Sequence, residues 1–137
     1  MLFADLLGKH ILVVEDDYLQ ASALGAALEE QGSEIVGPFP GLEDGLSAIE
    51  REPVDAAVLD IQVNETKIFP LADRLAERGI PFVFVTGYNR DILPARFHGR
   101  DCIFKPVCMD ALAVALATSM ANAHGEHGHK IPPAQVT

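Results

Sequence analysis

Acidic, hydroxyl and amine side chains follow four short apolar runs of this sequence. The runs cover residues 11–14, 56–59, 82–85 and 102–104, and the reactive residues directly after them are Glu15, Asp16, Asp17, Asp60, Thr86 and Lys105. Clustered carboxylates repel one another unless a cation joins them, and their oxygens suit Mg²⁺ or Mn²⁺ better than zinc. With a hydroxyl and an amine nearby, such a metal could bind phosphoryl oxygens, and one carboxylate could act as a nucleophile that forms an aspartyl phosphate.

The apolar runs predict strands, and helical patterns separate them. Runs without polar alternation are typical of parallel strands buried on both faces, and a shorter run of this kind is Ile35-Val36. Apolar residues recur at helical spacing in segments 17–31, 42–49, 70–79 and 109–123, and a weak short helix is expected around 90–97. The alternation of strand and helix predicts a doubly wound α/β fold, either flavodoxin-like or Rossmann-like.

The reactive residues are expected to meet at one rim of this sheet, because open α/β sheets bind ligands at the carboxyl ends of their strands. A nucleotide site would need a phosphate-binding loop after the first strand, where three acids would repel phosphate. Neither a P-loop nor a G-x-G-x-x-G motif is present. The sequence therefore predicts a divalent-metal site that handles phosphoryl groups.

The composition is globular and acidic. The 137 residues are 49% hydrophobic and 22% charged, with a formal net charge of −10. Residues 1–60 hold thirteen of the acidic residues and only two basic ones, a balance that argues against binding to nucleic acid or anionic lipid. With no apolar run long enough to span a membrane, no apparent signal peptide and two cysteines, we expect a single-domain cytoplasmic protein.

Four motifs resemble the receiver domain of two-component response regulators. They are Ile11-Leu12-Val13-Val14-Glu15-Asp16-Asp17, Val58-Leu59-Asp60, Phe84-Val85-Thr86-Gly87 and Phe104-Lys105-Pro106. Each motif is weak alone, but four at the ends of successive strands form a specific combination. The resemblance implies a flavodoxin-like receiver fold with five helices and a five-stranded parallel sheet of order 2-1-3-4-5. The receiver would span 8–122, after an N-terminal extension (1–7) and before a flexible His/Pro-containing tail (123–137).

The resemblance also implies a role for each site residue. Asp60 would accept the phosphoryl group. The ligands of Mg²⁺ (or Mn²⁺) would be Glu15, Asp16, Asp60 and the Gln62 main-chain carbonyl. Thr86 and Lys105 would contact the phosphoryl group, and the Lys105-Pro106 bond would be cis, an isomer found in about 5–6% of X–Pro bonds. No ligand role is expected for Asp17.

A narrower resemblance lies in residues 81–88. This string is similar to that of the FAT GUY receivers of alphaproteobacteria, with Val85 in place of Ala. Those are commonly stand-alone receivers in phosphorelays. Cys102 occupies the position of the usual aromatic switch residue, so Tyr88 is either its substitute or an ordinary half-buried loop residue. The loop after Asp60 departs from the family pattern as well, because it has Asn64 in place of a proline and lacks the usual glycine.

The end of the chain raises two further questions. Residues 111–121 carry no charge. Their apolar residues predict either a homodimer or partner face that includes Leu112, Leu116 and Met120, or simply an alanine-rich surface helix. The histidines that follow are spaced as a possible metal site, although a polar tail is the favoured interpretation, and they are His124, His127 and His129.

The sequence leaves three functions open. The first is a stand-alone response regulator receiver that signals and is not an enzyme. A histidine kinase or histidine phosphotransfer protein would phosphorylate Asp60, and the signal would pass to a downstream protein by contact or onward phosphotransfer. The second is a pseudo-receiver that docks without phosphorylation. The third is a Mg²⁺-dependent phosphatase, which Gln62 disfavours because that class commonly has a second Asp two residues after the nucleophile.

Overall fold

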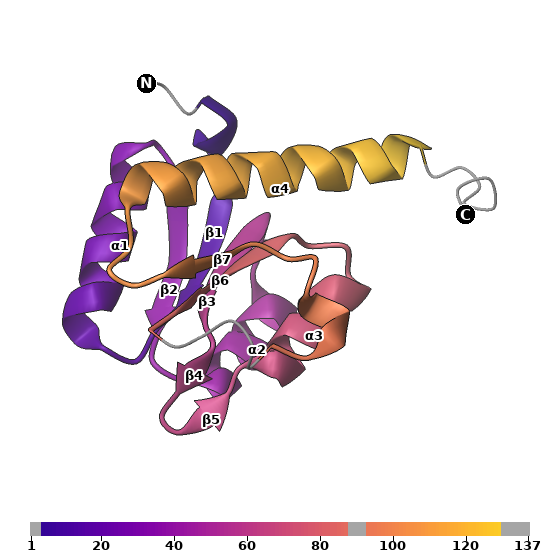
Figure 1. The fold of residues 1–137 in the computed structure, drawn as a ribbon. Coiled ribbons are helices and arrows are strands. Elements are labelled where there is room, and N and C mark those ends of the chain that lie inside the picture. Colours follow the sequence, from indigo (N-terminus) through magenta and orange to yellow (C-terminus); the bar gives the residue numbers. More distant parts are fainter. Residues whose placement is uncertain (1–3, 88–92, 130–137) are drawn as a thin grey trace.

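A parallel sheet forms the centre of the computed structural model, which describes residues 4–87 and 93–129 and, of these, the side chains of 5–87 and 93–123. The sheet contains five parallel strands in the described ranges, in the order β2-β1-β3-β6-β7 (Figure 1). The strands are β1 (His10–Val14), β2 (Glu34–Phe39), β3 (Ala56–Asp60), β6 (Phe82–Thr86) and β7 (Cys102–Phe104). Since β6 and β7 are the fourth and fifth predicted strands, the predicted order 2-1-3-4-5 is confirmed.

Four α-helices accompany the sheet within the described ranges, where five helices were predicted. They are α1 (Tyr18–Glu30), α2 (Leu42–Arg51), α3 (Phe69–Glu77) and α4 (Met109–His129). The helix expected around 90–97 is replaced in its described part by the single 3₁₀ turn η3 (Ala95–Phe97). Pro94 directly before this turn has no N–H and an extended backbone, and the segment is too short to sustain an α-helix.

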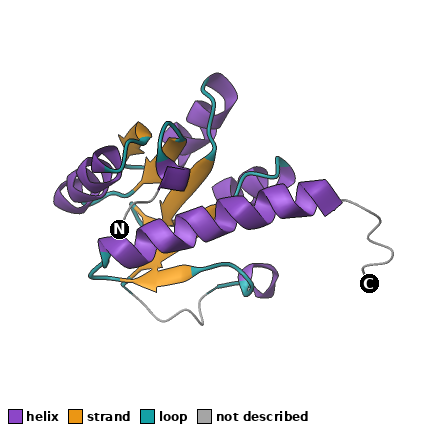
Figure 2. Cartoon of the chain, turned by 90° about the horizontal axis from the view of Figure 1, so that it is seen from above, coloured by secondary structure: helices purple, strands orange, loops and turns teal. Residues whose placement is uncertain are grey.

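The helices cover both faces of the sheet, with α1 and α4 on one side and α2 and α3 on the other (Figures 1 and 2). In β1, Ile11 and Val13 pack on the α1–α4 side, whereas Leu12 and Val14 pack on the α2–α3 side. All five residues of β3 and all five of β6 are buried. This double coverage explains why the strands read as unbroken apolar runs.

The predicted interface residues of the last helix lie inside the protein. Leu112 and Leu116 are fully buried and Met120 is 7% exposed, and all three pack in the core between α4 and the sheet. The prediction that they form a dimer or partner face is therefore wrong, because the sheet of this same chain covers them. Val114, on the same helix, is a large apolar residue that is exposed. In the described ranges, no helix is both long and apolar enough to cross a membrane.

Both ends of the domain extend further than the sequence predicted. Ala4–Leu6 form the 3₁₀ turn η1, Leu6 is completely buried, and its carbonyl accepts a hydrogen bond of 2.9 Å from the Ser33 hydroxyl. At the other end, α4 continues to His129, through the first part of the predicted flexible tail. Adding a residue to an existing helix adds a hydrogen bond, and no proline lies between Met109, where α4 begins, and Pro132. The side chains of the three tail histidines lie outside the described residues.

A short hairpin follows β3 and was not predicted. Its strands β4 (Gln62–Val63) and β5 (Thr66–Lys67) are antiparallel and joined by a two-residue turn. Both turn residues, Asn64 and Glu65, have positive φ, at 49° and 63°. Two positive φ angles in a two-residue loop define a type I′ turn, whose twist matches that of the flanking strands.

Candidate functional site

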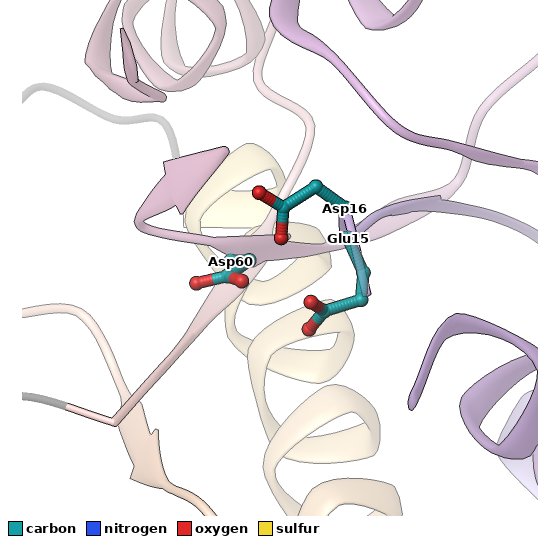
Figure 3. Close-up of side chains that lie close together, drawn as sticks. All are labelled: Glu15, Asp16 and Asp60. Carbon is teal, nitrogen blue, oxygen red and sulfur yellow. The ribbon is translucent and has the colours of Figure 1, made fainter. Parts of the chain in front are cut away.

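Three carboxylates meet at the carboxyl ends of β1 and β3 (Figure 3). Glu15 and Asp16 directly follow β1, and Asp60 is the last residue of β3. One carboxylate oxygen from each residue lies within 4.8 Å of the others. β1 and β3 are adjacent parallel strands whose pairing ends at Val14 and Leu59, so the next residues emerge side by side. The structure thus brings together the three acids that the strand ends predicted.

Lys105 reaches this acidic cluster from the far edge of the sheet. Its Nζ atom lies 3.0 Å from Asp60 Oδ2 and 3.1 Å from Glu15 Oε1. Burial lowers the pKa of this ammonium group, but the hydrogen bonds to Asp60 and Glu15 outweigh burial and raise the pKa above its ordinary value. The residue therefore carries a full positive charge between two carboxylates. The Lys105–Pro106 peptide bond is cis, the isomer that the resemblance implied.

Glu15 is the most deeply buried acid of the cluster, with 2% of its surface exposed. Burial, followed by the negative charge of Asp60, raises the pKa of Glu15 from its ordinary value of 4.5 to about 7. The Asp17 N–H donates to Oε2 at 3.0 Å. Oε1 is buried and, although it is close to the Lys105 ammonium, accepts no hydrogen bond from the described residues. An unsatisfied buried carboxylate oxygen is costly, and a bound cation would satisfy it.

This donor set fits Mg²⁺. Mg²⁺ prefers hard oxygen ligands and is commonly bound through one or two carboxylates while keeping several waters. The cluster supplies three carboxylates at the wall of an open cavity. One of their oxygens, Glu15 Oε1, accepts no hydrogen bond from the described residues. Gln62 also lines this cavity, and its N–H lies 3.4 Å from Asp60 Oδ1. The main-chain carbonyl of Gln62 remains a predicted ligand of Mg²⁺.

Thr86 lies on β6, which pairs with β3, and Cys102 lies on β7, the next strand beyond β6. Thr86 ends β6, is 1% exposed, and its carbonyl accepts a 2.9 Å hydrogen bond from the Lys105 N–H. That bond joins the two residues predicted to contact a phosphoryl group. Cys102 is partly buried and packs against the α2–α3 side of the core, as a small apolar residue would. The prediction for Tyr88 lies outside the described residues.

Two further residues support the acidic cluster. Asp17 is the N-cap of α1, because its Oδ1 accepts a 3.0 Å hydrogen bond from the Gln20 N–H. The Asn64 N–H donates to Asp16 Oδ2 at 2.7 Å, a contact that the sequence analysis missed. The available signal was the residue type, since Asn tolerates the left-handed turn conformation better than most residues.

The response regulator receiver domain family model matches residues 11–117. The chain therefore belongs to the response regulator receiver domain family. The five-stranded parallel sheet and the acidic cluster at its carboxyl rim agree with this membership.

Known proteins of this family resemble the chain over most of its length. It is similar to the solved structure of SdrG from Sphingomonas melonis, with 37% identity, a TM-score of 0.73, and coverage of 85% of this chain and 98% of SdrG. A CheY-like receiver from Methanospirillum hungatei shares the fold, with 24% identity, a TM-score of 0.77, and coverage of 87% of this chain and 98% of that receiver. The sensory transduction protein LytT of Bacillus anthracis is 33% identical over 70% of this chain and 41% of LytT. The chain spans less than half the length of the curated relatives that it matches.

Proposed function

We propose that this chain is a stand-alone receiver that accepts a phosphoryl group on Asp60, in a Mg²⁺-dependent reaction, from a histidine kinase or histidine phosphotransfer protein. The observation that carries the proposal is the position of Lys105, whose ammonium lies 3.0 Å from Asp60 Oδ2 beside the acidic cluster. A nucleophilic carboxylate, a fixed cation and a metal-binding donor set are the groups that phosphoryl transfer to an aspartate requires.

The transfer exchanges one bond to phosphorus for another. A carboxylate oxygen of Asp60 attacks the phosphorus atom of a phosphohistidine, a phosphorus–oxygen bond forms, and the phosphorus–nitrogen bond breaks, so that the imidazole leaves. Mg²⁺ bound by the three carboxylates and the Gln62 carbonyl would neutralise part of the phosphoryl charge. Lys105 would then pair with a phosphoryl oxygen, and the Thr86 hydroxyl would donate to another.

The phosphorylated protein would signal by protein–protein contact or by onward phosphotransfer. One similarity supports a receiver of the FAT GUY kind, a group whose members are commonly stand-alone. The string 81–88 has the FAT GUY pattern apart from Val85. A further solved structure of SdrG, 38% identical to this chain, is described as its BeF3-activated conformation, and it covers 81% of this chain and 95% of that one with a TM-score of 0.68. In this chain, Tyr88 would replace the aromatic switch residue that is absent at Cys102.

Incubation with acetyl phosphate and Mg²⁺, followed by intact-mass measurement, tests this function. We expect a gain of one phosphoryl group that is absent in Asp60→Ala and absent when EDTA removes the metal. Asp17→Asn is the matched control, because Asn also caps helices well and the variant leaves all four proposed ligands intact. It should gain the same mass as the wild type.

Other outcomes of this experiment identify the alternative functions. No mass gain in the wild type, with the fold intact, would indicate a pseudo-receiver that docks without phosphorylation. Rapid repeated hydrolysis of phosphate esters would indicate a phosphatase. A gain that persists in Asp60→Ala would place the phosphoryl group on another residue and contradict the assignment of Asp60.

A further inference from the structure

The β4–β5 hairpin contacts the acidic cluster through the main chain of one turn residue. The Asn64 N–H donates to Asp16 Oδ2 at 2.7 Å, across 48 residues of sequence. Asp16 is the exposed member of the cluster, whereas Glu15 and Asp60 are buried. The exposed carboxylate has the most freedom to rotate into water, so a hydrogen bond that holds one of its oxygens restricts it the most. The other oxygen, Oδ1, is left for a metal.

The side chain of the same residue ties the hairpin to the β2–α2 connection. Asn64 Nδ2 donates to the Pro40 carbonyl at 2.9 Å. The preceding residue, Phe39, accepts a 2.9 Å hydrogen bond from the Glu15 N–H through its carbonyl. Asn64 therefore links Asp16 to the segment that also holds Glu15.

We infer that Asn64 is a positioning residue for the metal ligand Asp16, an inference that rests on the proposed Mg²⁺-dependent function. The hydrogen bond from its side chain to the Pro40 carbonyl holds the turn in one conformation. In that conformation the Asn64 N–H points toward Asp16 Oδ2. Ligating carboxylates are commonly held by hydrogen bonds from residues outside the metal's own shell, and loss of such a bond typically weakens metal binding about 10- to 100-fold. Asn64 thereby acts on Mg²⁺ affinity without touching the metal.

A simpler role would be that of a turn residue only. Position 64 has a φ of 49°, a conformation in which glycine is the least strained residue. Glycine keeps the main-chain N–H but lacks the amide that reaches Pro40. Asn64→Gly therefore separates the two roles, since a residue needed only for its backbone conformation is replaced by glycine without loss.

The test compares Asn64→Gly with the wild type and with the matched control Thr66→Val. Thr66 lies on the same hairpin, and its hydroxyl donates one long hydrogen bond of 3.4 Å to the Asn64 carbonyl, without contacting Asp16 or Pro40. NMR titration with MgCl₂ measures the dissociation constant, amide exchange measures protection at position 64, and acetyl phosphate measures the phosphorylation rate at saturating Mg²⁺.

In Asn64→Gly we expect the Mg²⁺ dissociation constant to rise about tenfold. This is the low end of the 10- to 100-fold range, because glycine keeps the main-chain N–H that contacts Asp16. The amide at position 64 should exchange faster, and the phosphorylation rate at saturating Mg²⁺ should match that of the wild type. Thr66→Val should resemble the wild type in all three measurements. A dissociation constant unchanged in Asn64→Gly, or raised equally in Thr66→Val, would overturn the inference. If the wild type binds no Mg²⁺, the proposed function itself fails.

Discussion

Glu15 is the site residue whose burial is the least favourable in free energy when no metal is bound. Its carboxylate is buried beside Asp60, and one of its oxygens accepts no hydrogen bond from the described residues. When this carboxylate is ionised, it lies beside the negative charge of Asp60 and is poorly hydrated. The Lys105 ammonium offsets only part of the resulting unfavourable free energy, so the pKa stays raised. The same features that destabilise the metal-free carboxylate make it a good ligand for a divalent cation.

The contribution of Glu15 to the stability of the metal-free protein should therefore fall as pH rises from about 4.5 to about 7. The pKa of Glu15 is about 7 in the folded protein, above its ordinary value of 4.5. Within this interval the unfolded chain releases the proton while the folded chain keeps it, so rising pH favours unfolding. Urea unfolding in EDTA at several pH values measures the trend.

Glu15→Gln is the control for this titration, because glutamine keeps the shape and cannot ionise. The difference in unfolding free energy between variant and wild type should grow in favour of the variant across the same interval and level off above it. A difference that does not change with pH would show that Glu15 keeps an ordinary pKa.

At the scale of single elements, α4 shows how a sequence pattern can be interpreted in two ways. Its uncharged stretch has apolar residues on more than one side, and either a partner protein or the sheet of the same chain could cover the face with Leu112 and Leu116. The structure shows that the sheet covers this face, while Val114 is 48% exposed. The helix pattern alone is the same in both cases, because burial depends on where the helix lies and not on its own residues.

Two truncations on α4 test this assignment. Leu116→Ala removes a fully buried side chain and should lower the free energy of unfolding by about 2–5 kcal/mol. Val114→Ala, two residues earlier on the exposed side, should change it by about 0.5 kcal/mol or less. Urea unfolding measures both. Equal losses in the two variants, or a change of oligomeric state only in Leu116→Ala, would contradict the buried position of Leu116.

The hairpin is the element that the sequence indicated least. The sequence of the loop after Asp60 departs from the family pattern but predicts no strands there. Two strands of two residues each are too short for a period-2 pattern to appear. The turn residue Glu65 also has a positive φ, where Asn or Gly is the usual signal of a type I′ turn.

For the whole molecule, Mg²⁺ binding should appear as added stability. A ligand that binds only the folded state raises the free energy of unfolding, by about 2.7 kcal/mol when its free concentration is about 100 times its dissociation constant. We expect this increase at neutral pH for the wild type and a much smaller one for Asp16→Asn, which lacks one ligand charge. Thermal or urea unfolding with and without MgCl₂ measures it.

Calcium chloride and sodium chloride, each at the ionic strength of the MgCl₂ samples, are the controls for that experiment. Sodium separates specific binding from the screening of the net charge of −10, which any salt provides. If sodium stabilises the protein as much as Mg²⁺ does at equal ionic strength, the effect is screening, and the cluster holds no specific cation under these conditions.

The sequence by itself determined the strands and the reactive residues at their ends, whereas the strand order was implied only by the resemblance to receiver domains. Strands buried on both faces need continuous apolar runs, and the residue after each run must emerge at the carboxyl rim, so Asp60 and Lys105 could be placed without coordinates. These features are local, because each depends on a few consecutive residues and on the general geometry of parallel sheets.

Only the tertiary structure decided which surfaces are covered and which distant groups touch. The burial of Leu6 and Leu116 follows from the position of α4 across the sheet, and the contact of Asn64 with Asp16 joins residues 48 apart in the chain. Such contacts are set by how the elements pack together and by the φ angles of single turn residues. Local patterns do not encode the packing, and Asn64 by itself is only a weak signal for the turn, so the contacts that support the metal site became visible only in the folded protein.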